Sequence, residues 1–213
     1  MDRDELRDLA RHWDGLAGQY VERLYDELSH KPRDRELLAR FADLAAAVGG
    51  PVLDLGCGPG HVTRHLHQLG LEARGLDLSP AMIELARQLN PDLDFQTGDM
   101  LELDIEPWSL SGAVAFYSMI HLVRDDVGQV VEHLAQAIKP HGPLLIAVHA
   151  GEGILTADEV FGEPVTMAIT LFRQEEIVAA VEQQGFEVEV AETRAPYPGE
   201  AETRRVYVLA TRR

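Results

Sequence analysis

The sequence predicts an α/β fold, in which helices cover both faces of a mostly parallel β-sheet. Three observations support this prediction. Between residues 51 and 148, five short apolar runs alternate with stretches of helical periodicity. Ordinary helix start and stop signals punctuate these stretches. Near the end of the chain, two more strand-like segments are joined by a link too short for a helix, which indicates an antiparallel pair.

Residues 1–48 are expected to form helices. Apolar residues recur at helical spacing over 6–13 and again over 16–28, and the pair Asp14-Gly15 predicts a break between the two stretches. Pro32 suits the first turn of another helix, which Gly49-Gly50 would end. These residues therefore form a helical N-terminal part that precedes the sheet.

The sheet is predicted from the alternating segments that follow. Gly70 is expected to end one connecting helix, Ser79-Pro80 to begin the next, and Asp125-Asp126 to open a third. The five apolar runs between them are predicted to be parallel strands at residues 51–55, 72–76, 93–96, 112–116 and 144–148.

Two strands are expected at the end of the chain. From Phe186, apolar residues alternate with glutamates, which predicts a strand with one wet face near the sheet edge. Residues 206–210 are apolar at every position, so this strand belongs in the interior, antiparallel and inserted beside an earlier parallel strand. With no internal repeat and no domain boundary, one domain is expected over 1–213, with its α/β core at 51–213.

Composition and charge limit the classes of substrate and the cellular location that are expected. Thirty-six acidic and nineteen basic residues give a net charge of −17, which favours a small-molecule substrate over nucleic acid. The single cysteine excludes an intrachain disulfide and fits a reducing compartment. The charged start of the chain and the lack of an 18-residue apolar run disfavour secretion and membrane spanning. A cytoplasmic protein is therefore expected.

The most informative segment is the loop after the first strand, residues 52–60. Here a buried strand runs into Gly56, Gly58 and Gly60 and then into a helix. Glycines permit positive φ and let a ligand touch the backbone, and the helix presents free N–H groups to an anionic group. Such a loop lies at the usual binding crevice of an open α/β sheet.

Three carboxylates at strand ends identify the ligand class. Asp54 precedes the glycines and is suited to an amine, while Asp77 lies 21 residues after Gly56, where a carboxylate accepts from a ribose diol. Asp99 follows the third strand and is suited to an adenine amino group. His61 stands where a dinucleotide motif has its third glycine, which argues against pyrophosphate. Together these groups describe S-adenosylmethionine better than a nicotinamide dinucleotide.

On these residues the sequence resembles the class I S-adenosylmethionine-dependent methyltransferases, particularly their small-molecule subgroup. The resemblance implies a Rossmann-like, doubly wound sheet of seven strands with the last strand antiparallel, and a helical lid at residues 1–48. It also implies S-adenosylmethionine as the cofactor, with S-adenosylhomocysteine as the product. The cofactor-binding residues that it implies are Tyr20, Asp54, Gly56, Cys57, Gly58, Gly60, Asp77, Leu78, Met82, Asp99, Met100 and Tyr117.

His121 is the candidate catalytic residue. It follows the fourth strand, and an imidazole accepts a proton at neutral pH. The competing interpretation is a histidine that only shapes the pocket, because methyl transfer from a sulfonium often needs no base. His149, after the fifth strand, is a weaker candidate. His61 and His65 have the spacing of metal ligands, but no third ligand is indicated and their face is expected to be exposed, so no metal is expected.

The sequence thus predicts a methyltransferase that acts on a small molecule by in-line displacement. Two alternatives stay open: an NAD(P)-dependent oxidoreductase, and a protein that binds S-adenosylmethionine without catalysis. Methylation of nucleic-acid bases is disfavoured, because the segment after the fourth strand lacks an Asn/Asp-Pro-Pro-Tyr string. Residues 150–171 form a long connection that, with the N-terminal helices, is expected to shape the acceptor pocket.

Overall fold

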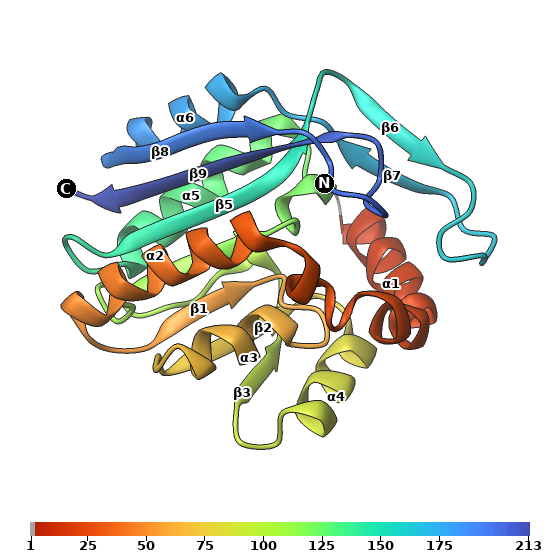
Figure 1. The fold of residues 1–213 in the computed structure, drawn as a ribbon, viewed down its shortest axis with the longest axis horizontal. Helices are drawn as coiled ribbons and strands as arrows, with labels where there is room; N and C mark the ends of the chain where they lie inside the picture. The colour runs from red at the N-terminus through yellow and green to blue at the C-terminus, as the bar shows by residue number, and fades with distance from the viewer. Residues whose placement is uncertain (1–2) are drawn as a thin grey trace.

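A seven-stranded β-sheet forms the centre of the structure, a computed structural model that describes residues 3–213 (Figure 1). The strand order is β3-β2-β1-β4-β5-β9-β8. Five strands are parallel: β1 (Val52–Leu55), β2 (Ala73–Asp77), β3 (Asp94–Thr97), β4 (Gly112–Phe116) and β5 (Pro143–Ala150). The predicted strands match these within two residues at either end.

The last strand confirms the prediction of an antiparallel insertion. Strand β9 (Arg204–Arg212) lies between β5 and the edge strand β8 (Phe186–Arg194) and is antiparallel to both. Val206 to Ala210 are all buried, whereas Glu187 and Glu189 on β8 are exposed. The uniform and the alternating apolar patterns therefore correspond to an interior and an edge position.

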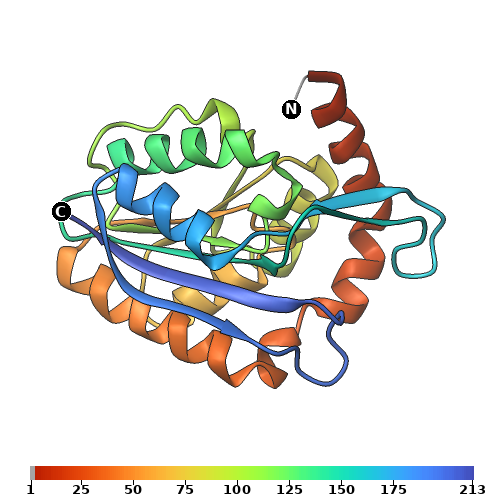
Figure 2. The same cartoon turned by 90° about the horizontal axis from the view of Figure 1, so that it is seen from above.

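Helices cover both faces of the sheet, as Figure 2 shows. Helices α2 (Pro32–Val48) and α3 (His61–Gln68) pack on one face. Helices α5 (Arg124–Ala137) and α6 (Gln174–Gln183) pack on the other, where α5 buries the stripe Val127, Val130, Val131 and Leu134. Helix α4 (Pro80–Leu89) lies against the edge strand β3. The strand order reverses between β1 and β4, which is where open α/β sheets bind their ligands.

Helix α1 (Arg3–Leu24) runs without interruption through Asp14 and Gly15, so the break predicted there is wrong. The Asp14 side chain, which in isolation favours a turn, instead accepts hydrogen bonds from residues of α4 and its cap. Leu16 and Ala17, the next residues, are buried. Tertiary contacts thus override the local turn signal. A short 3-10 helix, η1 (Glu27–His30), joins α1 to α2.

The connection predicted over residues 150–171 contains a hairpin that the sequence analysis missed. Strands β6 (Ile154–Ala157) and β7 (Met167–Thr170) form a separate two-stranded antiparallel sheet. Strand β6 is largely exposed, so its residues do not alternate between a buried and an exposed face. The period-2 sequence pattern that predicts a strand is therefore weak here. The hairpin lies beside α1 in both ribbon views (Figures 1 and 2). Within residues 3–213, no helix has the length and apolar character needed to cross a membrane.

Candidate active site

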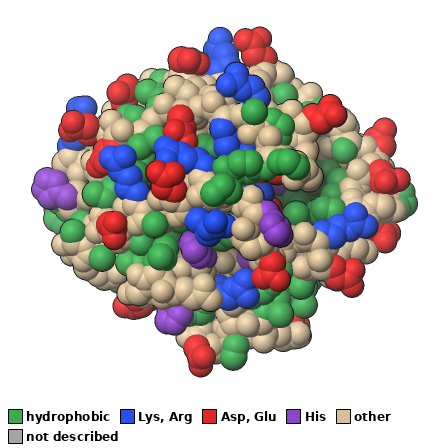
Figure 3. Space-filling model, viewed as in Figure 1, with side chains coloured by type: hydrophobic (Ala, Val, Ile, Leu, Met, Phe, Trp, Pro, Cys, Tyr) green, Lys and Arg blue, Asp and Glu red, His purple; other side chains and the backbone are tan. Residues whose placement is uncertain are grey.

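A cavity of about 580 Å³ opens at the carboxyl ends of the parallel strands. Loops after β1, β2, β3 and β4, together with the end of β5, form its floor, and α1 covers it. The space-filling view shows apolar side chains gathered in a hollow of this face (Figure 3). The cavity thus lies at the crevice predicted from the strand and loop pattern.

The glycine loop between β1 and α3 presents bare backbone to the cavity. Gly56 has φ +73°, and a Cβ there would overlap the Ser118 side chain. Gly58 has φ +53°, and a Cβ there would meet no atom within 4 Å because it would project into open space. Both glycines line the cavity. A ligand therefore has direct access to the main chain at this loop, as the nucleoside cofactor of the sequence prediction requires.

Asp77 lies at the end of β2, half-buried in the cavity wall. Its Oδ2 accepts the Gly58 N–H and its Oδ1 the Ser79 N–H, both at 2.8 Å. Burial raises the pKa of the Asp77 carboxyl, and these two N–H groups oppose the rise. Each oxygen keeps a lone pair for a ligand hydroxyl. The other predicted residues in this part of the wall are Leu78, Met82, Asp99 and Met100.

Three predicted binding residues lie outside the cavity wall. Asp54 is buried beneath the loop, where it accepts a 2.6 Å hydrogen bond from the Thr63 hydroxyl, and burial raises its pKa to about 6. Cys57 is packed in a small apolar cluster, and burial raises the pKa of its thiol. A Cβ at Gly60 would meet the ring of Phe95 at 2.7 Å. In the described structure these residues support the loop from behind, and cofactor contact by them remains a prediction.

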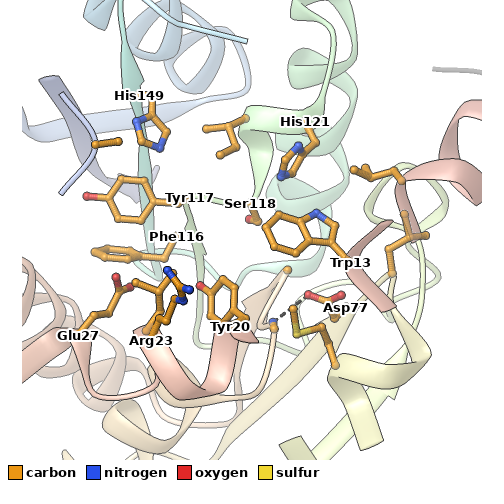
Figure 4. A pocket seen from close by; sticks show the side chains of 18 of the residues that line it. Trp13, Tyr20, Arg23, Glu27, Asp77, Phe116, Tyr117, Ser118, His121 and His149 are labelled. Atoms are coloured by element: carbon orange, nitrogen blue, oxygen red, sulfur yellow. Dashed lines mark hydrogen bonds between the residues drawn. The ribbon is translucent and has the colours of Figure 1, made fainter. Parts of the chain in front are cut away.

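Aromatic side chains of α1 close one side of the cavity (Figure 4). The Tyr20 ring lies edge-to-face with Trp13 at 5.8 Å between centroids, and Trp13 lies 5.5 Å from the His121 ring. Burial, and then the charge of Glu27, raises the pKa of the Tyr20 hydroxyl. His61, on a face expected to be exposed, is instead buried beside Tyr20, with its Nε2 3.2 Å from Glu27.

Asp14 fastens α1 to the loop that carries Asp77, a role that the sequence analysis missed. Its Oδ1 accepts the Ser79 hydroxyl at 2.6 Å and the Ala81 N–H at 3.0 Å. These bonds cap the first turn of α4. They also attach α1, the helix that covers the cavity, at Ser79, which lies two residues after Asp77 in the sequence. The sequence analysis used Asp14 only for a predicted helix break, and only distant contacts reveal this function of the carboxylate.

Two histidines line the cavity on the side away from Asp77 (Figure 4). His121 lies in the 3-10 helix η3 (Met119–His121) after β4, with its Nδ1 3.4 Å from the Ala168 carbonyl oxygen. His149 lies near the end of β5, with its Nδ1 2.6 Å from the Thr203 hydroxyl. Burial lowers the pKa of each to about 4, aided at His149 by the charge of Arg205. Both imidazoles are therefore neutral at pH 7.

Acid is expected to destabilise the fold through these histidines. A folded-state pKa of about 4 lies below the ordinary 6.5, so the unfolded chain binds more protons between these values. The contribution of the two neutral histidines to the free energy of unfolding is fully present above about pH 6.5 and is lost as the pH falls toward 4. Urea unfolding from pH 7.5 to 4.5 should show a smaller loss for His121→Gln than for the wild type. The exposed His67→Gln is the control, and equal slopes for both variants would contradict the assignment.

A buried charged cluster, also missed by the sequence analysis, forms the far end of the cavity. Lys31 Nζ lies 2.6 Å from Glu27 and 3.1 Å from Glu200, and Glu200 also accepts two bonds from Arg194. Tyr117, with φ +57°, lies above it, its hydroxyl 2.7 Å from that of Tyr207. The charged cluster comprises Glu27, Lys31, Asp34, Arg194, Glu200 and Arg205. Its members come from two segments about 160 residues apart, so no sequence spacing reveals it.

Comparison with known proteins finds a family match over the core. Residues 52–142 match the family described as "Methyltransferase domain". A dTDP-3-amino-3,6-dideoxy-alpha-D-glucopyranose N,N-dimethyltransferase from Streptomyces fradiae is 31% identical over 137 residues, which are 61% of this chain and 53% of that protein. Trans-aconitate 2-methyltransferase from Escherichia coli is 38% identical over 99 residues, 45% of this chain and 37% of that protein. The chain thus spans about half the length, or less, of these relatives.

Solved structures share the fold. Magnesium protoporphyrin IX methyltransferase from Synechocystis PCC 6803, solved with bound S-adenosylmethionine, superposes with a TM-score of 0.74 at 16% identity, covering 100% of this chain and 99% of that one. The glycopeptide N-methyltransferase MtfA, solved with the same molecule, gives 0.63 at 18% identity, covering 83% and 94%. At these identities the likeness concerns the arrangement of helices and strands alone.

Proposed function

Because residues 52–142 match the methyltransferase domain family, we propose that the chain is a class I S-adenosylmethionine-dependent methyltransferase that transfers the methyl group of S-adenosylmethionine to a small-molecule acceptor. The observation that carries the proposal is one cavity with two unlike ends. The bare glycine loop and Asp77 form one end, and aromatic rings with two neutral histidines form the other. A nucleoside cofactor and an acceptor thus have separate places in one enclosed space.

The cofactor end has groups for each part of S-adenosylmethionine. Asp77 is suited to accept from the ribose diol, and Asp99, which already accepts the Leu101 N–H at 2.9 Å, to accept from the adenine amino group. Leu78, Met82 and Met100 supply apolar wall for the adenine. When bound, the cofactor supplies an electrophilic methyl carbon on a positively charged sulfur. The protein's own contribution is to hold the acceptor in line and to exclude water.

His121 is proposed as the group that takes a proton from the acceptor. A carbonyl oxygen only accepts hydrogen bonds, so the Ala168 carbonyl 3.4 Å from Nδ1 favours the tautomer with its proton on Nδ1. Nε2 then carries the lone pair. Burial keeps this imidazole neutral at pH 7, so the Nε2 lone pair in the cavity wall is available to accept a proton.

The test is direct titration followed by turnover. Calorimetry should show micromolar or tighter binding of S-adenosylhomocysteine and none of NAD⁺. Incubation with S-adenosylmethionine and a metabolite library should then release S-adenosylhomocysteine with at least one acceptor. Binding without release from any acceptor would favour a non-catalytic S-adenosylmethionine-binding protein, and NAD⁺ binding would favour the oxidoreductase. We further propose that the protein works in the cytoplasm, since its one cysteine is a buried thiol.

Asp14→Ala is expected to weaken S-adenosylhomocysteine binding about tenfold, because the loss of two hydrogen bonds loosens both α1 and the turn beside Asp77. Calorimetry measures the change. The control is Asp8→Ala, which removes an exposed α1 carboxylate that pairs with Arg11 at the surface. Equal affinities for the two variants would show that Asp14 does not position the site.

A further inference from the structure

The two cavity histidines have opposite hydrogen-bonding character. As argued above, the Ala168 carbonyl leaves His121 with a bare Nε2, which is a hydrogen-bond acceptor. Figure 4 shows both imidazoles directed into the cavity from neighbouring strand ends. The character of His149 follows from its own partner.

His149 presents a donor. Its Nδ1 lies 2.6 Å from the Thr203 hydroxyl oxygen, which itself accepts a 2.8 Å hydrogen bond from Arg205 Nη1. Because the Thr203 hydroxyl oxygen accepts this bond from the guanidinium, we assign its own proton as the donor to His149 Nδ1. A neutral imidazole that accepts at Nδ1 carries its proton on Nε2. The cavity therefore offers one acceptor, at His121, and one donor, at His149.

The charged cluster behind His149 leaves no net charge for a ligand to balance. It contains three cations, Lys31, Arg194 and Arg205, and three carboxylates, Glu27, Asp34 and Glu200. All six side chains are at least 87% buried. A charged acceptor would bury a further charge without a partner of opposite sign in the cluster, and the desolvation of such a charge costs free energy. Arg23 and His30 also border the cavity, but both are exposed, and Arg23 donates a 3.0 Å hydrogen bond to the Phe161 carbonyl oxygen.

The walls between the two histidines are aromatic. Trp13, Tyr20, Phe116 and Tyr117 surround the space, with Phe161 of the hairpin segment closing over Tyr20 at 6.1 Å. Aromatic pairs gain about 0.5–1.5 kcal/mol beyond the burial of their area, a gain that an aliphatic chain lacks. The shape of the cavity thus favours a planar acceptor.

We propose that the acceptor is an uncharged, planar phenol-type molecule that gives its hydroxyl proton to His121 and accepts a hydrogen bond from His149 through a second oxygen. This inference rests on the proposed methyltransferase function. The acceptor oxygen forms a bond to the methyl carbon while the carbon–sulfur bond breaks and leaves its electron pair on sulfur. The hydroxyl proton passes to His121 Nε2 and then to solvent. No other reactant is needed.

Three matched probes test the acceptor class: 4-hydroxybenzamide, which is neutral, 4-hydroxybenzoate, an anion, and tyramine, a cation. Each is titrated by calorimetry into protein saturated with S-adenosylhomocysteine. The neutral probe is expected to bind at least tenfold more tightly than either charged probe. Preference for the anion or the cation, equal binding, or no binding of any probe would overturn the inference. Failure of S-adenosylhomocysteine itself to bind would instead overturn the proposed function.

Two histidine variants separate the roles. His149→Leu is expected to weaken 4-hydroxybenzamide binding about tenfold, and His149→Gln, which keeps an N–H donor, to restore it within threefold. His121→Gln is expected to leave that binding within threefold but to slow formation of 4-methoxybenzamide at least a hundredfold, followed by mass spectrometry. Thermal unfolding confirms that each variant is folded. Equal binding by the two His149 variants, or unchanged turnover in His121→Gln, would overturn the assigned roles.

Discussion

Replacing Asp77 by alanine is expected to weaken S-adenosylhomocysteine binding by about a hundredfold or more. The carboxylate holds the Gly58 and Ser79 N–H groups at 2.8 Å and faces the cavity with its remaining lone pairs. Its removal is expected to take away the charge-assisted bonds proposed to the ribose, each worth about 1.5–3 kcal/mol, and to free the glycine loop from β2. Asp77→Asn, which keeps one accepting oxygen, should lose less, about tenfold.

Calorimetry on the three proteins gives these affinities directly. The control is Asp92→Ala, which removes an exposed acid just before β3 and so reports the effect of charge alone. A hundredfold loss in Asp77→Ala with an unchanged control supports the ribose contact. An affinity within threefold of the wild type would place the cofactor elsewhere in the cavity.

Asp34→Ala is expected to lower the free energy of unfolding by about 3–5 kcal/mol, because its buried polar partners would lose the carboxylate that accepts their hydrogen bonds. Asp34 has no exposed surface, and its Oδ1 accepts the Tyr207 hydroxyl at 2.6 Å and Arg194 Nη2 at 3.1 Å. Burial raises the pKa of Asp34, while Tyr207 and Arg194 hold it down. Without the carboxylate, the Arg194 charge loses one of its two acidic partners.

Urea unfolding measures this loss. Tyr207→Phe removes one hydroxyl of the same network and is expected to cost only about 1 kcal/mol. The control is Glu36→Ala at the exposed ion pair with Arg33, expected within about 0.5 kcal/mol of the wild type. If Asp34→Ala costs less than about 1 kcal/mol, the charged cluster does not hold the two ends of the chain together.

The parts of the fold that the sequence predicts are those that local patterns encode. The run of apolar residues at 206–210 and the alternation after Phe186 sufficed to place an interior and an edge strand. Asp14-Gly15 carries an equally clear local signal, but the contacts of Asp14 with Ser79 and Ala81, 65 residues and more away, decide the outcome. Local rules contain no information about such distant partners.

The site shows the same division. Spacing along the chain predicted that Asp77, Asp99, Gly56 and Gly58 line one cavity, because parallel strands end at one edge of the sheet. Spacing does not show whether a side chain faces the cavity or lies beneath the loop, and Asp54 lies beneath it. The charged cluster escaped prediction because Lys31 and Asp34 meet Arg194 and Glu200 only in the folded chain.

Strand β9 is paired with a neighbour on each side. Eight residue pairs join it to β5 and eight join it to β8. Without β9, both neighbouring strands would expose unpaired N–H and C=O groups, which are a template for association with other chains. Substitutions that displace β9 are therefore expected to cause aggregation of the protein.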